Sequence, residues 1–462
     1  MRVQKHEYLG GGQMNNSSRL TKSILVFSLV ALCLVLFGAS ALTTKTYACA
    51  FGAYRPAAYE GGENRLLYIH AIDAAANNLL FPQDARFALD RLEQGTRYNR
   101  YVGGGYVPPT LIKSIAWVET KMTMATKSTA WNGLGDSVIS FDCGHGVMQV
   151  TTGMINPLGE NSQPSDAQAL ISTHFTYNIA KGVKILGAKW NNAPQISPIV
   201  GTDTDSQTEI LENWYYATWA YNGFTGYGSY SSNHPLDPSF TWPRSQYSCS
   251  GKQSHNEFPY QELVWGCIKN PPTINGTPLW SPIPITLPDL FSTEVNRALS
   301  PGNFYPPYAN MDIKTPAPWH TEVTPANFLQ EEAKLIGRPI LSVPPRSHTI
   351  RMNSPAAITW VDIPIRNSGS GLSTWRAKSS VGFLVVNPPA GIAPGDNLTC
   401  TAASCDTTSL RIEVNPTLLP ASYATGVVSI WSPNEKSAPI EITINVVADF
   451  ELTFPGSSKN SD

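Results

Sequence analysis

Charged residues are scarce in this chain of 462 residues: Asp, Glu, Lys and Arg together make up 14% of it, against about a quarter in an average globular protein. The formal net charge is only −2, which excludes the basic footprint of a nucleic-acid-binding protein. Neither a Cys-x-x-Cys pair nor a His-x-x-x-His spacing occurs. The sequence therefore predicts no zinc site and no other metal or cofactor.

Apolar and aromatic residues are plentiful by contrast. Hydrophobic residues make up 42% of the chain, which includes 12 Trp and 19 Tyr. That is enough for more than one core, and a chain of this length is expected to fold into two or three domains. Aromatic rings also suit the binding of sugars, although we expect most of them to lie in the cores.

The N-terminal segment has the pattern of an export signal. Arg19 and Lys22 precede the apolar run Ile24–Phe37, and the small residues Gly-Ala-Ser-Ala follow it. Counted through Leu42, the run is about long enough to span a bilayer, so residues 24–42 are either a cleaved signal peptide or a retained membrane anchor. In both cases the positive flank places the rest of the chain outside the cytoplasm, in the periplasm, the cell wall or the medium.

Export changes how the seven cysteines are interpreted. Cys33 lies within the apolar run, and the other six are expected to form disulfides in an oxidising compartment. The candidate pairs are Cys400 with Cys405, Cys249 with Cys267, and Cys49 with Cys143. The sequence alone leaves the pairing open.

The chain divides into five segments by sequence pattern. Residues 1–48 hold the export signal, and residues 49–233 repeat apolar positions at helical spacing, which predicts a mostly α-helical domain. Residues 234–337 are rich in Pro and Trp, which predicts an irregular extension and linker. Residues 338–450 are short β-branched runs between turn clusters, typical of an all-β sandwich with antiparallel strands. Residues 451–462 resemble a disordered tail.

One carboxylate stands out in the helical segment. In the stretch LIKSIAWVET the residues Ile112, Ile115 and Glu119 fall on one stripe of a helix, so Glu119 points toward the interior or a cleft. It is either a structural residue paired with a buried cation, or an acid whose pKa is raised by burial. An acid of the second kind stays protonated near neutral pH and can protonate a leaving oxygen, as glycosidic bonds require.

Three further motifs follow Glu119 in a defined order. The first element is Glu119-Thr120 itself. The motifs that follow it are Gly146-Val147-Met148-Gln149, Asn178-x-x-x-Gly182 and Ala220-Tyr221-Asn222. Together they resemble the soluble lytic transglycosylase (SLT-type) domain family, in which Ser usually follows the Glu. The resemblance implies a lysozyme-like α-helical fold with a cleft between two lobes. It also implies that Glu119 is the single catalytic acid/base and that Gly146, Met148, Gln149, Tyr221 and Asn222 bind the substrate.

The implied reaction cleaves the β-1,4 bond between N-acetylmuramic acid and N-acetylglucosamine in peptidoglycan and leaves 1,6-anhydro ends. One alternative is a hydrolytic muramidase in which Asp136 or Asp142 positions a water molecule, although both aspartates also fit turn or cap positions. Another alternative is a wall-binding protein without catalysis. The expected partner is the peptidoglycan glycan strand, and the oligomeric state is not predicted.

The C-terminal segment resembles a bacterial immunoglobulin-like domain of the BACON type. The matching stretches are Asn-Ser-Gly-x-Gly-Leu-x-x-Trp, ending at Trp375, and Leu-Pro-x-x-Tyr-x-x-Gly, ending at Gly426. The resemblance implies a targeting or spacer role. Trp375 is either a core residue of the sandwich, which we expect, or an exposed platform for a sugar.

Overall fold

A computed structural model describes most of the chain after residue 48. The described residues are 49, 65–125, 134–154, 163–196, 201–224, 227, 232–241, 243–300, 312–322, 336–395 and 408–450. The chain divides into two units, residues 1–48 and 49–462. The predicted signal or anchor, the Cys400–Cys405 pair and the predicted tail therefore lie outside the described residues. None of the described helices has the length and apolar character of a membrane span.

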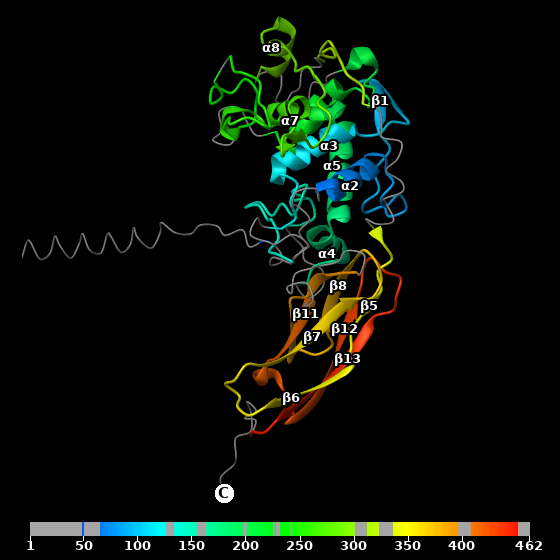
Figure 1. The fold of residues 1–462 in the computed structure, drawn as a ribbon, viewed down its shortest axis with the longest axis vertical. Helices are drawn as coiled ribbons and strands as arrows, with labels where there is room; N and C mark the ends of the chain where they lie inside the picture. Colours follow the sequence, from blue (N-terminus) through cyan, green and yellow to red (C-terminus); the bar gives the residue numbers. More distant parts are fainter. Residues whose placement is uncertain are drawn as a thin grey trace, which may run out of the picture. The chain divides into compact units, whose positions relative to one another are not determined.

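Helices followed by β-sheets make up the second unit, as the sequence pattern predicts (Figure 1). The helices are α2 (Arg65–Ala76), α3 (Pro109–Thr120), α4 (Asp166–Thr173), α5 (Phe175–Ile196), α6 (Tyr215–Tyr221), α7 (Tyr260–Lys269) and α8 (Thr293–Leu299). A hairpin of β1 (Glu93–Thr96) and β2 (Asn99–Val102) lies between α2 and α3. The helices share one core that contains the fully buried Trp214, Trp219 and Trp265.

Helix α3 is fixed at both ends. Pro109 occupies its first turn, where a missing N–H costs nothing, and the carboxylate of Glu322 accepts hydrogen bonds from the Thr110 backbone N–H at 2.8 Å and from its hydroxyl at 2.5 Å. The helix ends where Lys121 adopts a left-handed conformation (φ 60°). Midway, Lys113 forms a buried ion pair with Asp73 of α2 at 2.7 Å.

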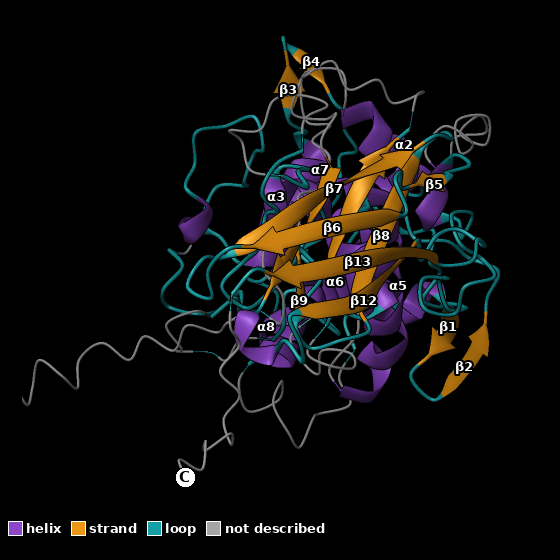
Figure 2. Ribbon diagram, turned by 90° about the horizontal axis from the view of Figure 1, so that it is seen from below, coloured by secondary structure: helices purple, strands orange, loops and turns teal. Residues whose placement is uncertain are grey.

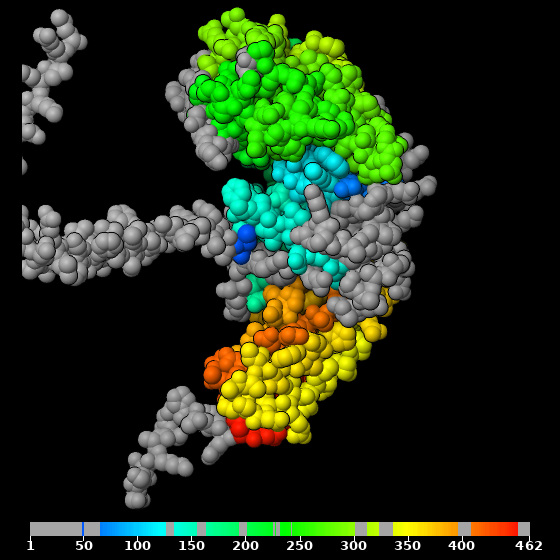
Figure 3. All heavy atoms as spheres, turned by 60° about the vertical axis from the view of Figure 1, so that its left-hand side comes forward, coloured from blue at the N-terminus to red at the C-terminus, as the bar shows by residue number. Residues whose placement is uncertain are grey.

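The Pro- and Trp-rich extension is more regular than its composition indicates. Helix α7 lies inside it, contacts α3 and is almost entirely buried, and α8 and the short strands β3 (Thr273–Ile274) and β4 (Thr277–Pro278) follow. The proline content is misleading because Pro259 stands at the N-cap of α7, where proline is compatible with a helix. The segments in cyan and green, which contain α3 and α7, adjoin one another on the surface (Figure 3).

The extension is attached to the helical core through a buried carboxylate. Glu212, in the 3₁₀ turn Leu211–Trp214, is fully buried. Its oxygens accept hydrogen bonds from the backbone N–H of Thr286 at 3.1 Å and of His320 at 2.8 Å, and one of them contacts His320 Nδ1 at 2.8 Å. Two loop segments far apart in the sequence are thus held on one side chain.

Two sheets with a common core form the C-terminal domain. One sheet has the order β10 (Ala390–Pro394), β8 (Leu372–Ser379), β12 (Tyr423–Trp431), β13 (Ile440–Ala448), β6 (Ser347–Met352); the other has the order β5 (Leu341–Ser342), β7 (Thr359–Asn367), β11 (Thr408–Val414), β9 (Leu384–Asn387). Figure 2 shows β12, β13 and β6 side by side. The expectation of antiparallel strands fails at one place, because β13 pairs with β6 in parallel. These two strands are not joined by a hairpin, so their directions are free to agree.

Trp375 is a core residue of this domain. It is 1% exposed and packs among apolar side chains of both sheets, as expected. Gly391, its cross-strand neighbour, has no room for a side chain, because a Cβ there would lie 2.4 Å from the indole ring. Strand β8 also contacts helix α4: Arg376 forms an ion pair with Asp166 at 2.6 Å, and the hydroxyls of Thr374 and Thr173 are 3.0 Å apart.

We predict that Glu212→Ala lowers the free energy of unfolding by about 3 kcal/mol, because it leaves two backbone N–H groups and a histidine without their buried acceptor. Chemical denaturation followed by tryptophan fluorescence measures this change. Glu212→Gln keeps one acceptor oxygen and should lose less, and Glu257→Ala on the exposed surface should change little. A loss below about 1 kcal/mol for Glu212→Ala would show that the extension is held by its apolar contacts alone.

Candidate functional site

A pocket of about 610 Å³ opens beside the C-terminal end of α3. The lining residues come from α3, the loop before the Gly146–Gln149 turn, the turn itself, α5 and the end of α6. They are Glu119, Ser140, Phe141, Asp142, Gln149, Val150, Thr151, Thr152, Ile185, Lys189, Tyr221, Asn222 and Gly223. Three of the residues that the sequence pattern predicts to bind substrate, Gln149, Tyr221 and Asn222, thus line the same pocket as Glu119.

Glu119 is the chemically distinctive group of this pocket. Its pKa is raised to about 7, above all because burial removes water from its carboxyl group. The negative charge of Asp142 raises the pKa further, while a hydrogen bond from the Tyr260 hydroxyl, 2.6 Å from Glu119 Oε1, lowers it. A carboxyl group in this balance exchanges its proton near neutral pH and can act as an acid and then as a base.

The residue after Glu119 connects its helix to the Gly146–Gln149 turn. The Thr120 hydroxyl lies 3.0 Å from the carbonyl oxygen of Val147 and 3.3 Å from that of Ala116, and it accepts a hydrogen bond from the Thr123 backbone N–H at 3.1 Å. A hydroxyl is needed for these contacts, and serine also provides one. Thr120 therefore supplies the hydroxyl group that these contacts need.

Helix α5 holds the same turn from the other side. Asn178 accepts a hydrogen bond from the Met148 N–H at 2.9 Å and donates to the carbonyl oxygens of His145 at 2.7 Å and Ile171 at 3.0 Å. One turn later, a Cβ at Gly182 would lie 2.5 Å from Met148 Cβ, so only glycine allows this close approach. The Asn-x-x-x-Gly motif thus positions the turn on the surface of the helix.

Two predicted binding residues do not line the pocket. Gly146 and Met148 are buried, Met148 completely, and they lie within the turn that supports Gln149. Gly146 is needed for its left-handed conformation (φ 64°) and because Asn178 and Met124 leave no space for a Cβ. The carbonyl oxygen of Met148 accepts a hydrogen bond from the Tyr221 hydroxyl at 2.7 Å. Both residues therefore contribute to the support of the pocket instead of to its surface.

Of the two aspartates considered for water positioning, only Asp142 lines the pocket. It is exposed and receives a hydrogen bond from the Ser140 hydroxyl, while Asp136 is exposed elsewhere. The adjoining Cys143 forms a disulfide with Cys49, and a second disulfide joins Cys249 to Cys267. Both pairings are among those considered from the sequence. They are compatible with an exported protein.

Tyr260 is the functional residue that sequence reasoning missed. It lies at the start of α7, inside the segment predicted to be irregular, and it is almost completely buried between Glu119 and the core. Burial, the nearby charge of Glu119 and the hydrogen bond to that carboxyl group raise the pKa of the Tyr260 hydroxyl well above its ordinary range, so it donates and does not ionise. The helical spacing of Tyr260, Leu263 and Val264 after Pro259 is the signal that indicates this helix.

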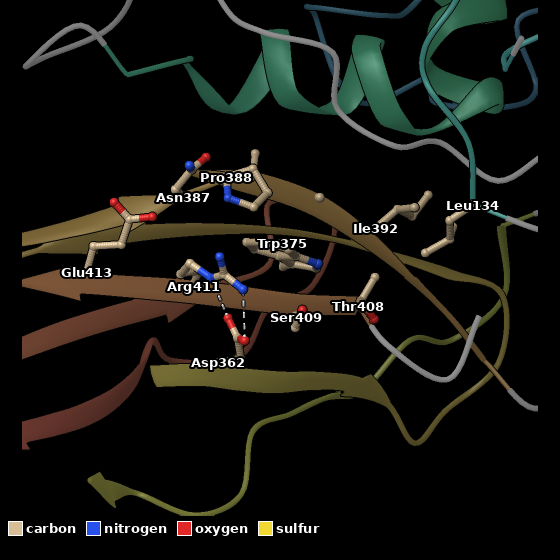
Figure 4. A pocket seen from close by; sticks show the side chains of 12 residues that line it. Leu134, Asp362, Trp375, Asn387, Pro388, Ile392, Thr408, Ser409, Arg411 and Glu413 are labelled. Carbon is tan, nitrogen blue, oxygen red and sulfur yellow. Dashed lines mark hydrogen bonds and ion pairs between the residues drawn. The ribbon is translucent and has the colours of Figure 1, made fainter. Parts of the chain in front are cut away.

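The C-terminal domain carries a second pocket, of about 410 Å³ (Figure 4). Arg411 and Asp362 form an ion pair at 2.9 Å on its wall, and Trp375 also lines it. The hydrogen bond from Arg411 lowers the pKa of the Asp362 carboxyl group, so this acid stays ionised at neutral pH. Its carboxylate is therefore unsuited to protonate a leaving group.

Comparisons with known proteins leave the family open. No protein-family model matches the sequence, and no curated protein sequence matches it. Solved structures with local similarity include a GH5 xyloglucanase of Bacteroides ovatus (13% identity, 24% of this chain and 19% of that chain, TM-score 0.17). They also include the periplasmic chaperone SfaE (10% identity, 25% of this chain and 61% of that chain, TM-score 0.19) and the YadV chaperone (8%, 25% and 55%, TM-score 0.19). None of them assigns an activity to this chain.

We predict that Glu119→Gln stabilises the protein in alkaline solution. The raised pKa means that ionisation of Glu119 opposes folding, so the wild type should lose up to about 3 kcal/mol relative to the variant between pH 4.5 and pH 7, and the difference should then level off. Denaturation at a series of pH values measures it. A flat curve for Glu119→Gln would contradict the raised pKa.

We predict that Tyr260→Phe moves this transition to higher pH, because it removes the hydrogen bond that favours the ionised carboxylate. The comparison is between Tyr260→Phe and the double variant Tyr260→Phe/Glu119→Gln, whose difference in stability isolates the titration of Glu119. An unchanged transition would mean that Tyr260 packs against Glu119 without bonding to its charged form.

Proposed function

We propose that the protein is an exported lytic transglycosylase that cleaves peptidoglycan. The observation that carries the proposal is the Glu119 carboxyl group, which is half-buried in the lining of a pocket of about 610 Å³ and has a pKa raised to about 7. The order of motifs after it supports the same assignment, because Gln149, Tyr221 and Asn222 line that pocket. In this proposal residues 49–233 are a lysozyme-like catalytic domain and residues 338–450 an immunoglobulin-like domain of the BACON type.

The reaction begins with proton transfer from Glu119 to the oxygen of the β-1,4 bond between N-acetylmuramic acid and N-acetylglucosamine. Positive charge then develops at the anomeric carbon of the muramic acid. The N-acetyl oxygen of the same sugar attacks and stabilises that carbon, so a carboxylate nucleophile is not required. Tyr260 keeps its hydrogen bond to Glu119 and stabilises the carboxylate left by the transfer.

The second step returns the proton. Glu119, now ionised, takes a proton from the 6-hydroxyl group of the muramic acid, and the freed oxygen attacks the anomeric carbon. The N-acetyl oxygen leaves and a 1,6-anhydro ring closes. The nucleophile belongs to the same sugar as the electrophile, which favours ring closure over attack by water.

Hydrolysis by a muramidase is the second candidate function, and the position of Asp142 favours it. This carboxylate lines the same pocket as Glu119 and is exposed at its wall, where it could orient a water molecule toward the anomeric carbon. Hydrolysis would leave a reducing end in place of an anhydro ring. The two products differ in mass by one water molecule.

We predict that the purified wild-type protein releases anhydro-muropeptides from sacculi and that Glu119→Gln lowers the rate by about 10²–10⁴-fold, the usual contribution of acid/base transfer. Mass spectrometry of the soluble products measures both. Glu257→Gln, at an exposed residue that does not line the pocket, should keep wild-type activity. If the products carried only reducing ends, the protein would be a hydrolase and not a transglycosylase. Unchanged lysis by Glu119→Gln would remove Glu119 from the mechanism.

A further inference from the structure

One positive charge lies in the Glu119 pocket and has no role in the proposed reaction. Among the described residues that line this pocket, Lys189 alone is cationic. It belongs to helix α5, one turn after Ile185, which also lines the pocket. The residue is partly buried, and its side chain forms part of the pocket wall.

Other lysines of the same helix differ from Lys189 in their contacts. Lys184 forms an ion pair with Asp90 at 2.7 Å, and Lys181 lies 3.5 Å from the carbonyl oxygen of Arg86. Lys189 makes neither an ion pair nor a hydrogen bond with any residue that the structure describes. Asp142, the exposed acid of the pocket, is engaged by the Ser140 hydroxyl. The ammonium group of Lys189 is therefore available to an anion that enters the pocket.

The proposed substrate carries such anions at defined places. The sugar rings of a peptidoglycan strand are neutral, and carboxylates occur only on the lactyl ether of muramic acid, when it is free, or on the peptide attached to it. An ammonium group in a partly enclosed pocket attracts a carboxylate more strongly than one in bulk water. A charge-assisted hydrogen bond would add to this attraction.

We propose that Lys189 binds a carboxylate carried by the muramic acid residue, either the lactyl carboxylate or one on the attached peptide. This inference rests on the proposed function, because it takes the peptidoglycan strand as the ligand. Lys189 would then determine which strands are bound, while Glu119 carries out the chemistry. It acts on specificity and is not required for proton transfer.

Binding to a catalytically inactive protein tests this proposal. Calorimetry with Glu119→Gln uses three probes: soluble glycan strands with their peptides, the same strands after amidase removal of the peptides, and chitin oligosaccharides, which have no carboxylate. Adding Lys189→Gln should weaken binding of one carboxylate-bearing probe about tenfold, a free-energy change typical of a bond to a charged group. Binding of chitin should weaken less than about twofold.

Two matched variants complete the experiment. Lys189→Arg keeps the charge and should restore most of the affinity, while Lys184→Gln, on the same helix with its charge paired to Asp90, should bind all probes as the parent does. A loss confined to peptide-bearing strands assigns the carboxylate to the peptide, and a loss confined to amidase-treated strands assigns it to the lactyl group. Either result supports the proposal.

Equal losses for chitin and for both carboxylate-bearing strands would overturn it, because Lys189 would then support the pocket without selecting a charge. No loss for any probe would overturn it as well. The wild-type cleavage assay, run on the same strands, is independent of these results. A wild type that binds through Lys189 but releases no products would contradict the proposed enzyme and leave the carboxylate site standing.

Discussion

The candidate chemistry of this protein depends on keeping one carboxyl group poor in water and poor in hydrogen-bond donors. A carboxylate that accepts several N–H bonds becomes a strong acid and stays ionised, as Asp362 does beside Arg411. Burial and the negative charge of Asp142 raise the pKa of Glu119, whereas one strong hydrogen-bond donor, the Tyr260 hydroxyl, lowers it. The result is a group that holds its proton at neutral pH and can also give it up.

That environment requires elements from distant parts of the chain to be positioned accurately relative to one another. The Gly146–Gln149 turn is held from three directions: by Thr120 of α3 through the Val147 carbonyl, by Asn178 of α5 through the Met148 N–H, and by Tyr221 of α6 through the Met148 carbonyl. Helix α7 contributes Tyr260, whose hydroxyl donates a hydrogen bond to Glu119. The three contacts with the turn fix its backbone, so this wall of the pocket is preorganised before any ligand arrives.

The sequence indicates part of this site and hides the rest for identifiable reasons. The i, i+3, i+7 stripe that ends at Glu119 predicts α3 and the inward direction of the carboxyl group, because helical periodicity is a local property. The sequence does not indicate the role of Tyr260, because the prolines on either side of α7 are typical of a loop. The burial of Met148 and the role of Glu212 in holding Thr286 and His320 depend on tertiary contacts that no local pattern contains.

The C-terminal domain shows the same division. Alternating burial along β7, β11 and β12 follows from the alternating residue types, and Trp375 lies in the core as its apolar surroundings predict. The parallel pairing of β6 with β13 is a matter of topology. The sequence of a short strand does not determine which strand it pairs with, because the pairing depends on the packing of the complete sheets.

The disulfide between Cys49 and Cys143 closes a ring of chain that contains α2, the β1–β2 hairpin and the whole of α3. A single cut of the backbone anywhere between these cysteines would leave the two pieces covalently joined through the disulfide. After a cut between Glu119 and Ser140, the acid and the pocket loop would lie on different pieces and remain tethered. In an oxidising environment, where the disulfide persists, one proteolytic cut within the ring would release neither piece. The segment that contains Glu119 would thus stay covalently attached to the rest of the protein after one cleavage.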